Sequence, residues 1–193
     1  MIMRAAACLV SVLLFTACSE QSEQETFGDA QGTITIDRPA PLVTGTDQDG
    51  NVFTTSALNG SYWLASFMFT TCQTVCPALN SVQADLANTY ASKGLRFVSI
   101  STDPDNDTPE ALRAYASRYR AMTGTWWMLT MPIDTVMHVA TRGFAVMGPE
   151  TPDMHSTRFV LVDRNQRIHD YFDSADSAEV VRLKRTLDSL LNS

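Results

Sequence analysis

The sequence predicts one α/β domain in which helices flank a mixed sheet, with a β-hairpin extension at its N-terminal end. Two observations lead to this prediction. Short apolar runs alternate with amphipathic segments, which is the pattern of strands joined by helices. The last two strand-like runs are close together and precede a final amphipathic segment, so the domain should end in a hairpin and a helix.

The hairpin extension is predicted at the start of the domain. Residues 42–46 and 51–55 are strand-like and flank Asp49 and Gly50, a pair that favours a tight turn. The next run, residues 62–69 (YWLASFMF), is almost continuously apolar. Such a run is typical of a strand that is buried on both faces of the sheet.

Helices and strands then alternate to the end of the chain. Residues 77–91 carry Leu79, Val82, Leu86 and Tyr90 at spacings of three and four, which predicts an amphipathic helix. On similar grounds the remaining predicted elements are strands at 95–101, 126–130, 157–163 and 168–172, and helices at 109–121, 133–142 and 178–191.

The N-terminal segment is predicted to be an export signal, residues 1–17. A short basic start is followed by an apolar stretch that is too short to cross a bilayer as a mature helix. Small residues precede Cys18, as in bacterial lipoproteins, where this cysteine becomes the lipidated first residue of the mature chain. If cleavage follows Ala17 without lipidation, the protein is exported and soluble.

The segment after the signal, residues 18–33, is rich in Glu, Gln and Ser and predicts a flexible tether. The folded domain then spans residues 34–193. We expect a membrane-anchored lipoprotein that faces the bacterial periplasm and touches lipid only through Cys18. The formal net charge of −7 argues against nucleic acid as a partner.

The segment TTCQTVCPAL, residues 70–79, carries the chemistry of the domain. Of the four cysteines, Cys8 leaves with the signal and Cys18 is the lipid site, so the mature domain keeps Cys72 and Cys76. Two nearby thiolates can form a disulfide or hold a soft metal ion such as Cu(I) or Zn(II). A structural role is a weak explanation, because the disulfide would close a short loop and structural zinc normally takes four protein ligands.

The two cysteines fall between a predicted strand and a predicted helix. Pro77 suits the first position of that helix, which would put Cys76 at or near its N-cap. The positive end of the helix would stabilise a thiolate there, which favours either disulfide exchange or metal binding. Thioredoxin-like oxidoreductases have two residues between their cysteines, whereas the three here leave room for a metal ion.

Three segments, TCQTVCP, SISTDPDNDTPEAL and HSTRFVLVD, resemble the signature segments of the SCO family, and the similarity extends over residues 40–191. The resemblance implies a thioredoxin-like fold on the outer side of an energy-conserving membrane. It also implies delivery of copper to the binuclear copper site of cytochrome c oxidase subunit II. By motif, Cys72 and Cys76 would be the thiolate ligands and His155 the third ligand.

This ligand set is chemically reasonable, because two thiolates and one imidazole suit Cu(I) and can hold Cu(II) with an added ligand. The chain has three histidines. His138 lies in an apolar helical stretch, where we expect a structural role, and His169 lies beside Asp170 on a strand, where we expect a surface role. His155 precedes a strand and can lie beside the cysteines if that strand is near the centre of the sheet.

The second signature segment invites a calcium interpretation, because Asp103, Asp105 and Asp107 alternate as in an EF-hand loop. The sixth position is Thr108 where glycine is needed, and the twelfth is Ala114 where a glutamate should stand. We therefore expect Asp107 or Thr108 to cap the following helix. Asp103 follows a strand next to the cysteines, so it either supports the metal ligands, forms part of a docking surface, or only caps a turn.

Methionines offer an alternative source of copper ligands, and the chain has nine. Met68 and Met128 lie in strand-like runs and should pack in the core. Met154 adjoins His155 and should point the opposite way in an extended segment. Met147 could act as a weak ligand from a loop.

Three functions fit these observations. The first is a copper metallochaperone that turns over no substrate and acts on oxidase subunit II. The second is a thiol–disulfide reductase that keeps the oxidase's copper-binding cysteines reduced, with other copper carriers or thioredoxin-like reductants as further partners. The third is a redox or copper sensor that signals to a membrane partner. Replacing His155 should abolish copper binding and spare disulfide exchange, which separates the first two.

Overall fold

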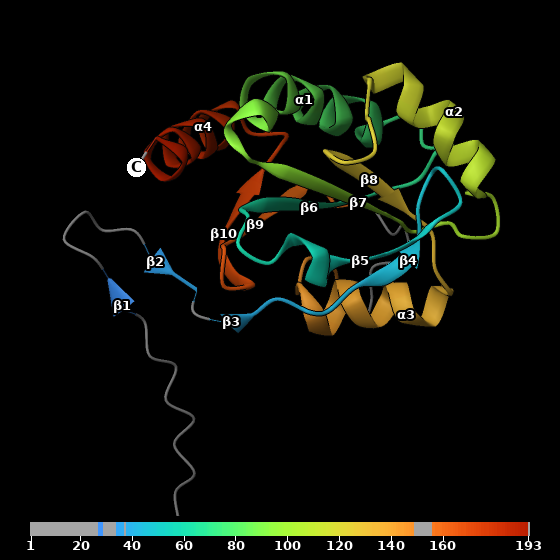
Figure 1. The fold of residues 1–193 in the computed structure, drawn as a ribbon, viewed down its shortest axis with the longest axis horizontal. Helices are drawn as coiled ribbons and strands as arrows, with labels where there is room; N and C mark the ends of the chain where they lie inside the picture. The colour runs from blue at the N-terminus through green and yellow to red at the C-terminus, as the bar shows by residue number, and fades with distance from the viewer. Residues whose placement is uncertain (1–26, 29–33, 37, 149–155, 193) are drawn as a thin grey trace, which may run out of the picture.

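The computed structural model of the chain describes residues 27–28, 34–36, 38–148 and 156–192. Six strands form one sheet in the order β3-β10-β9-β6-β7-β8, with helices on both sides of it (Figure 1). The strands of this sheet are β3 (Arg38–Pro39), β6 (Trp63–Met68), β7 (Arg96–Ser101), β8 (Trp126–Leu129), β9 (Arg158–Val162) and β10 (Arg167–Asp173).

The sheet is mixed. β6, β7 and β8 are parallel neighbours, whereas β9 runs antiparallel to β6, and β10 runs antiparallel to both β9 and β3. The carboxyl ends of the three parallel strands therefore meet at one edge, which is the usual position of a functional site in such sheets. Because β9 is antiparallel to β6, it begins at this same edge.

Three helices cover one face of the sheet (Figure 1). Their apolar sides pack against sheet residues such as Leu64, Phe97 and Phe159, all of which are fully buried. Burial of this apolar surface is the main force that holds the layers together. The helices are α1 (Val75–Tyr90), α2 (Pro109–Tyr119) and α4 (Ser177–Leu191), with a short 3₁₀ helix, Ala91–Lys93, after α1.

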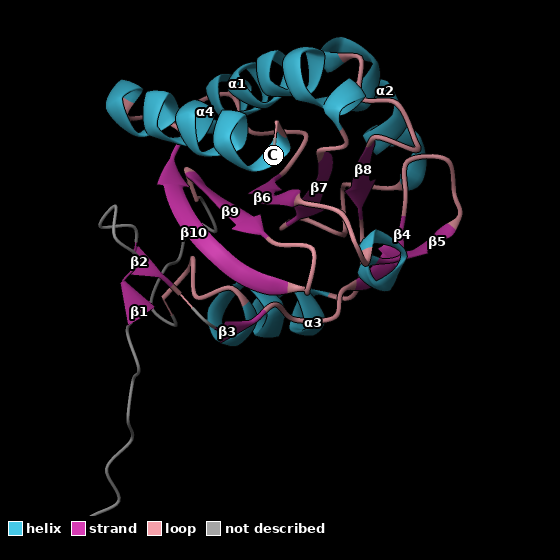
Figure 2. Cartoon of the chain, turned by 60° about the vertical axis from the view of Figure 1, so that its left-hand side comes forward, coloured by secondary structure: helices cyan, strands magenta, loops and turns pink. Residues whose placement is uncertain are grey.

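The opposite face packs against shorter elements (Figure 2). Phe144 lies edge-on to Trp63 and Phe67, with ring centroids 6.0 Å apart in each pair. The surrounding cluster is apolar and buried, and it forms a second core below the sheet. The elements on this side are β4 (Thr44–Thr46), β5 (Val52–Thr54), a 3₁₀ helix (Thr55–Leu58), α3 (Ile133–His138) and a π-helical turn (Val139–Gly143).

The predicted fold class is confirmed, including the mixed sheet, the flanking helices and the N-terminal hairpin. β4 and β5 pair as a separate two-stranded sheet around the predicted turn. The Asp47 carboxylate accepts hydrogen bonds of 2.9 Å from the backbone N–H groups of Asp49 and Asn51. Gly50 takes a positive φ of 85°, a conformation that costs glycine little.

A further short pair, β1 (Phe27–Gly28) and β2 (Ile34–Thr35), lies at the N-terminal end. β1 falls inside residues 18–33, the predicted tether. The predicted signal, residues 1–17, and the lipidation candidate Cys18 lie outside the described residues. Among the described residues, no helix has the length and apolar character needed to span a membrane.

Candidate functional site

The two cysteines lie where β6 leaves the sheet and α1 begins. We call residues 69–76 the thiol segment. α1 begins at Val75 with Thr74 as its N-cap, so Cys76 is the second helical residue and Pro77 the third. The prediction that Pro77 opens the helix was therefore wrong by two residues. Proline is tolerated here because N–H groups of the first turn have no partner within the helix.

The thiol segment brings the two cysteines into direct contact. The backbone N–H of Cys76 donates a hydrogen bond to Sγ of Cys72 at 3.3 Å. The hydroxyl of Thr74 lies 3.8 Å from the same sulfur. Both cysteines are buried, with 7% of Cys72 and 3% of Cys76 exposed. The first turn of α1 thus directs polar hydrogens at the Cys72 sulfur. The prediction that the helix N-terminus stabilises a thiolate at Cys76 was wrong, because the donors of this turn point at the other cysteine.

The two thiols differ in acidity. Burial would raise the pKa of Cys72, but hydrogen bonds from the thiol and backbone of Cys76 and from Thr74 outweigh it and leave that pKa below its ordinary value. Burial, together with the hydrogen bond to Cys72, raises the pKa of Cys76 to about 12. Cys72 is therefore the more acidic thiol of the pair, and Cys76 holds its proton more firmly.

A buried carboxylate that the sequence analysis considered only as a helix cap lies behind the thiol segment. Asp107 is fully buried. Its oxygens accept hydrogen bonds from the Thr70 N–H at 3.1 and 3.2 Å, the Thr70 hydroxyl at 2.5 Å and the Ser101 hydroxyl at 2.5 Å. Its charge also contributes, as the smallest of the named causes, to the raised pKa of Cys76.

Asp103, the predicted supporting residue, takes part in a turn. Its carboxylate accepts hydrogen bonds from the Asn106 amide at 3.0 and 2.8 Å, and its backbone carbonyl accepts from the N–H groups of Asn106 and Asp107. The helix cap is Thr108, whose hydroxyl accepts from the Ala111 N–H at 3.3 Å. Of the two residues predicted to cap α2, Thr108 does so, and Asp107 turns inward.

Another polar group supports the thiol segment from α1. Asn80 is fully buried, and its amide donates hydrogen bonds to the carbonyl of Cys76 at 2.9 Å and to the hydroxyl of Tyr115 at 3.1 Å. Tyr115 belongs to α2. This contact joins the first turn of the cysteine helix to its neighbouring helix.

The predicted third ligand, His155, and the adjacent Met154 lie outside the described residues. Among the described residues, no group of three or more His, Cys, Asp or Glu side chains could hold a metal ion. His169 is half-buried on β10. The prediction of a structural His138 was wrong, because this side chain is exposed while Val136 faces the core from the other side of α3.

The methionine predictions can be compared with the two cores. Met68 and Met128 are fully buried in the core that also contains the cysteines, as predicted. Met147 packs with the cluster on the opposite face of the sheet and is 7% exposed. The suggestion that Met147 acts as a loop ligand therefore gains no support from its packing.

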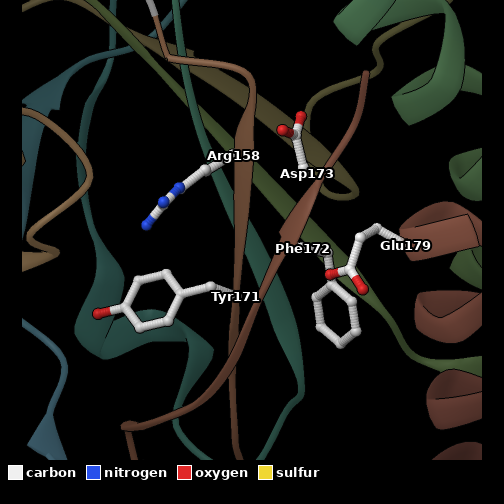
Figure 3. Close-up of a pocket in the computed structure, with 5 residues that line it drawn as sticks. All are labelled: Arg158, Tyr171, Phe172, Asp173 and Glu179. Carbon is white, nitrogen blue, oxygen red and sulfur yellow. The ribbon is translucent and has the colours of Figure 1, made fainter. Parts of the chain in front are cut away.

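A cavity of about 240 Å³ lies beside β10, at the N-terminal end of α4 (Figure 3). Arg158 and Tyr171 lie on one side of the strands, and Phe172 and Glu179 lie toward α4. Asp173 pairs with Arg158 across the strands. The residues that line the cavity carry both positive and negative charge, so the cavity indicates no particular class of ligand.

The comparisons with known proteins agree with this fold. The SCO1/SenC family model matches residues 42–188. A SCO1/SenC family lipoprotein from Bacillus anthracis superposes with a TM-score of 0.72 and 31% identity, over 81% of this chain and 96% of that one. BsSco is a member of the Sco family of cytochrome c oxidase assembly proteins in which a disulfide switch has been identified. It superposes with a TM-score of 0.70 and 26% identity, over 81% of this chain and 95% of that one.

Yeast Sco1, solved with copper bound, shares the fold with a TM-score of 0.62 and 24% identity, over 79% of this chain and 90% of that one. The family model covers most of the described domain, including both cysteines and Asp107. The chain therefore belongs to the SCO1/SenC family.

Proposed function

We propose that this protein is a copper metallochaperone that binds Cu(I) or Cu(II) through Cys72, Cys76 and His155. Its cargo would go to the binuclear copper site of cytochrome c oxidase subunit II. The observation that carries this proposal is the hydrogen bond from the Cys76 N–H to the Cys72 sulfur, because it fixes two soft donors at one helix N-terminus. Two thiolates and an imidazole are the donor set that suits Cu(I).

The course of β9 supports His155 as the third ligand. β9 begins at Arg158 and runs antiparallel to β6, with Ala65 opposite Val160. A chain that enters β9 does so at the edge where β6 continues into the thiol segment. In the sequence His155 comes three residues before the start of β9, which favours it as the third ligand.

Known relatives support copper as the cargo and oxidase assembly as the process. Yeast Sco1 has been solved with copper bound, and BsSco is described as an oxidase assembly protein. In this chain the residues fit the ion, because Cys72 already has a lowered pKa and thiolates are the metal-binding form. Cys76 would lose its proton when copper binds.

The test is a Cu(I) titration of the reduced full-length protein against a chelator of known affinity. We expect one Cu(I) per chain in the wild type and no stoichiometric copper in Cys72→Ala or His155→Ala. His138→Ala is the matched control, because His138 is an exposed histidine on α3, and it should bind copper as the wild type does. Failure of the wild type to compete with the chelator would overturn the proposal.

The unequal thiols favour a second candidate function, a thiol–disulfide reductase acting on the oxidase's copper-binding cysteines. The Cys72 thiolate would attack the partner's disulfide, break its S–S bond and form a mixed disulfide. Deprotonated Cys76 would then attack the Cys72 sulfur, which forms a Cys72–Cys76 disulfide and releases the partner's second thiol. Two electrons would pass from this protein to the partner.

A disulfide-bonded peptide that carries the two oxidase cysteines tests this candidate. The reductase function requires that His155→Ala reduces the peptide at the wild-type rate and that Cys72→Ala does not. If the wild type does not reduce the peptide, the reductase function is excluded. The copper titration still decides the metallochaperone proposal.

The proposed location follows the family. A relative from Bacillus anthracis is described as a lipoprotein. We propose that Cys18 is lipidated and that the domain faces the bacterial periplasm from its membrane anchor. In this position the cysteines could reach oxidase subunit II, other copper carriers and thioredoxin-like reductants.

A further inference from the structure

Asp107 occupies an unusual position for a carboxylate. It precedes the N-cap of α2, yet its side chain is fully buried and hydrogen-bonds to residues at the ends of two neighbouring strands. Thr70 is the second residue of the thiol segment, which follows β6, and Ser101 is the last residue of β7. One carboxylate therefore joins the carboxyl ends of two adjacent parallel strands, and we call its hydrogen bonds to Thr70 and Ser101 the Asp107 clamp.

The burial of this charge needs an explanation, because burying an ionised carboxylate is costly unless it is paired or well hydrogen-bonded. In the described parts of the chain, none of the ion pairs includes Asp107. Its compensation comes from the donors of Thr70 and Ser101. Helix capping does not explain why the Asp107 carboxylate is buried either, because the hydroxyl of Thr108 caps α2.

The clamp acts on the part of the chain that sets the sulfur positions. Both oxygens of Asp107 accept the Thr70 N–H, which fixes the peptide plane at the start of the thiol segment. Cys72 follows two residues later, and its own N–H bonds to the Phe69 carbonyl at 3.3 Å. Movement of Thr70 would therefore move the turn that carries the Cys72 sulfur.

From this geometry we infer that Asp107 is a positioning residue for copper binding: through Thr70 and Ser101 it holds the thiol segment in the conformation that brings the two sulfurs together. The inference rests on the proposed copper function. In this role Asp107 is not itself a ligand, because its carboxylate is engaged by the donors of Thr70 and Ser101. Residues that support metal ligands in this way commonly change metal affinity by about 10- to 100-fold when they are replaced.

Two substitutions separate positioning from a simple effect of charge. Asp107→Ala removes the clamp and the charge together. Asp107→Asn removes the charge and one of the two contacts to the Thr70 N–H but can keep the clamp, because its Oδ1 can accept the Thr70 N–H and its amide can donate to the Ser101 hydroxyl, which can accept as well as donate. Asp103→Ala is the matched control, since it removes a neighbouring carboxylate whose side chain bonds only within its own turn.

We expect Asp107→Ala to weaken Cu(I) binding about 10- to 100-fold and to shift the sulfur-to-Cu(II) absorption band. Asp107→Asn and Asp103→Ala should stay within about threefold of the wild type. Loss of negative charge alone would favour the thiolates, so a charge effect would instead tighten binding in both Asp107 variants. Wild-type affinity in Asp107→Ala, or equal changes in Ala and Asn, would overturn the positioning role.

A copper-free measurement addresses the clamp directly. Amide hydrogen exchange at Thr70 should be at least tenfold faster in apo Asp107→Ala than in the wild type, because that N–H loses both acceptors. It should be unchanged in Asp103→Ala. Unchanged protection of Thr70 would overturn the clamp even if copper binding fell.

If Asp107→Ala does not fold, Ser101→Ala removes one donor of the clamp and keeps the carboxylate. It should weaken Cu(I) binding severalfold, and wild-type affinity in this variant would overturn the inference. If the wild type binds no Cu(I), the proposed function itself is overturned. If the wild type binds Cu(I) and Asp107→Ala binds it equally well, only the positioning role is overturned.

Discussion

The backbone N–H of Cys76 donates a hydrogen bond to the Cys72 sulfur at 3.3 Å. The first turn of α1 therefore stabilises negative charge on the sulfur of Cys72, which lies just before the helix. The relation is not symmetrical. The pKa of Cys72 lies below its ordinary value, whereas that of Cys76 is raised to about 12 by burial and by the hydrogen bond to Cys72. The two thiols should therefore lose their protons in a fixed order, Cys72 first.

This order predicts the pH dependence of alkylation in the reduced, copper-free protein. A lowered pKa leaves more thiolate at a given pH, so Cys72 should react with iodoacetamide at a lower pH than Cys76. In Cys76→Ala, Cys72 loses the thiol donor but keeps the backbone N–H donor, so its reaction profile should move to higher pH. Peptide mass spectrometry across a pH series measures both. Gln73→Ala, an exposed change in the same segment, should leave the profile in place. Preferential labelling of Cys76 would contradict the assignment.

Gln48 should matter for stability because it completes the edge of the sheet. Its buried side chain donates to the Trp126 carbonyl at 2.9 Å and accepts from the Met128 N–H at 2.8 Å, as a neighbouring strand would. Gln48→Ala leaves both backbone groups of β8 without this partner, which should cost about 2–4 kcal/mol of unfolding free energy. Urea denaturation measures the change. Asn165→Ala, at an exposed turn, should cost less than about 0.5 kcal/mol. Equal stability of the two variants would contradict this role.

The main elements could be predicted from the sequence because their patterns are strong. The apolar run at 62–69 became β6, whose six residues are all buried, since it lies at the centre of a sheet covered on both faces. The start of α1 was misplaced because a proline preference for the first helical position is a tendency, and here the helix begins at Val75. The prediction for His138 failed because its neighbours in the sequence are apolar, whereas successive residues of a helix point in different directions. Val136 is buried on α3 and His138 is exposed.

The supporting carboxylate could not be identified from spacing. Asp103 and Asp107 both follow β7 on one short loop, and the sequence does not say which one turns inward. The Asp103 carbonyl accepts the N–H groups of Asn106 and Asp107, and this tight turn aims the Asp107 side chain at Thr70. One signal was available: Thr108 followed by Pro109 is a sufficient helix start, which leaves the preceding acid without a capping role.

Lipidation of Cys18 is testable on the mature protein. We expect intact mass spectrometry of membrane-extracted protein to show a chain that begins at Cys18 and carries acyl groups. Cys18→Ser should remove the added mass and release the domain from the membrane fraction, while Cu(I) binding stays unchanged because the cysteines of the thiol segment are intact. An unmodified N-terminus after Ala17 in the wild type would instead support export without an anchor.

Oxidation of the cysteine pair should switch copper binding off. A Cys72–Cys76 disulfide consumes both thiolates, so the oxidised protein can offer copper no thiolate donor from this site. After treatment with diamide, we expect the loss of stoichiometric Cu(I) binding and of both alkylatable thiols, and dithiothreitol should restore them together. Cys18→Ser should behave in the same way, which excludes a contribution from that thiol. Because the raised pKa of Cys76 keeps that thiol protonated near neutral pH, raising the pH should speed the oxidation. Full copper binding by a protein whose Cys72–Cys76 disulfide is verified by mass spectrometry would contradict thiolate ligation, and with it the proposed site.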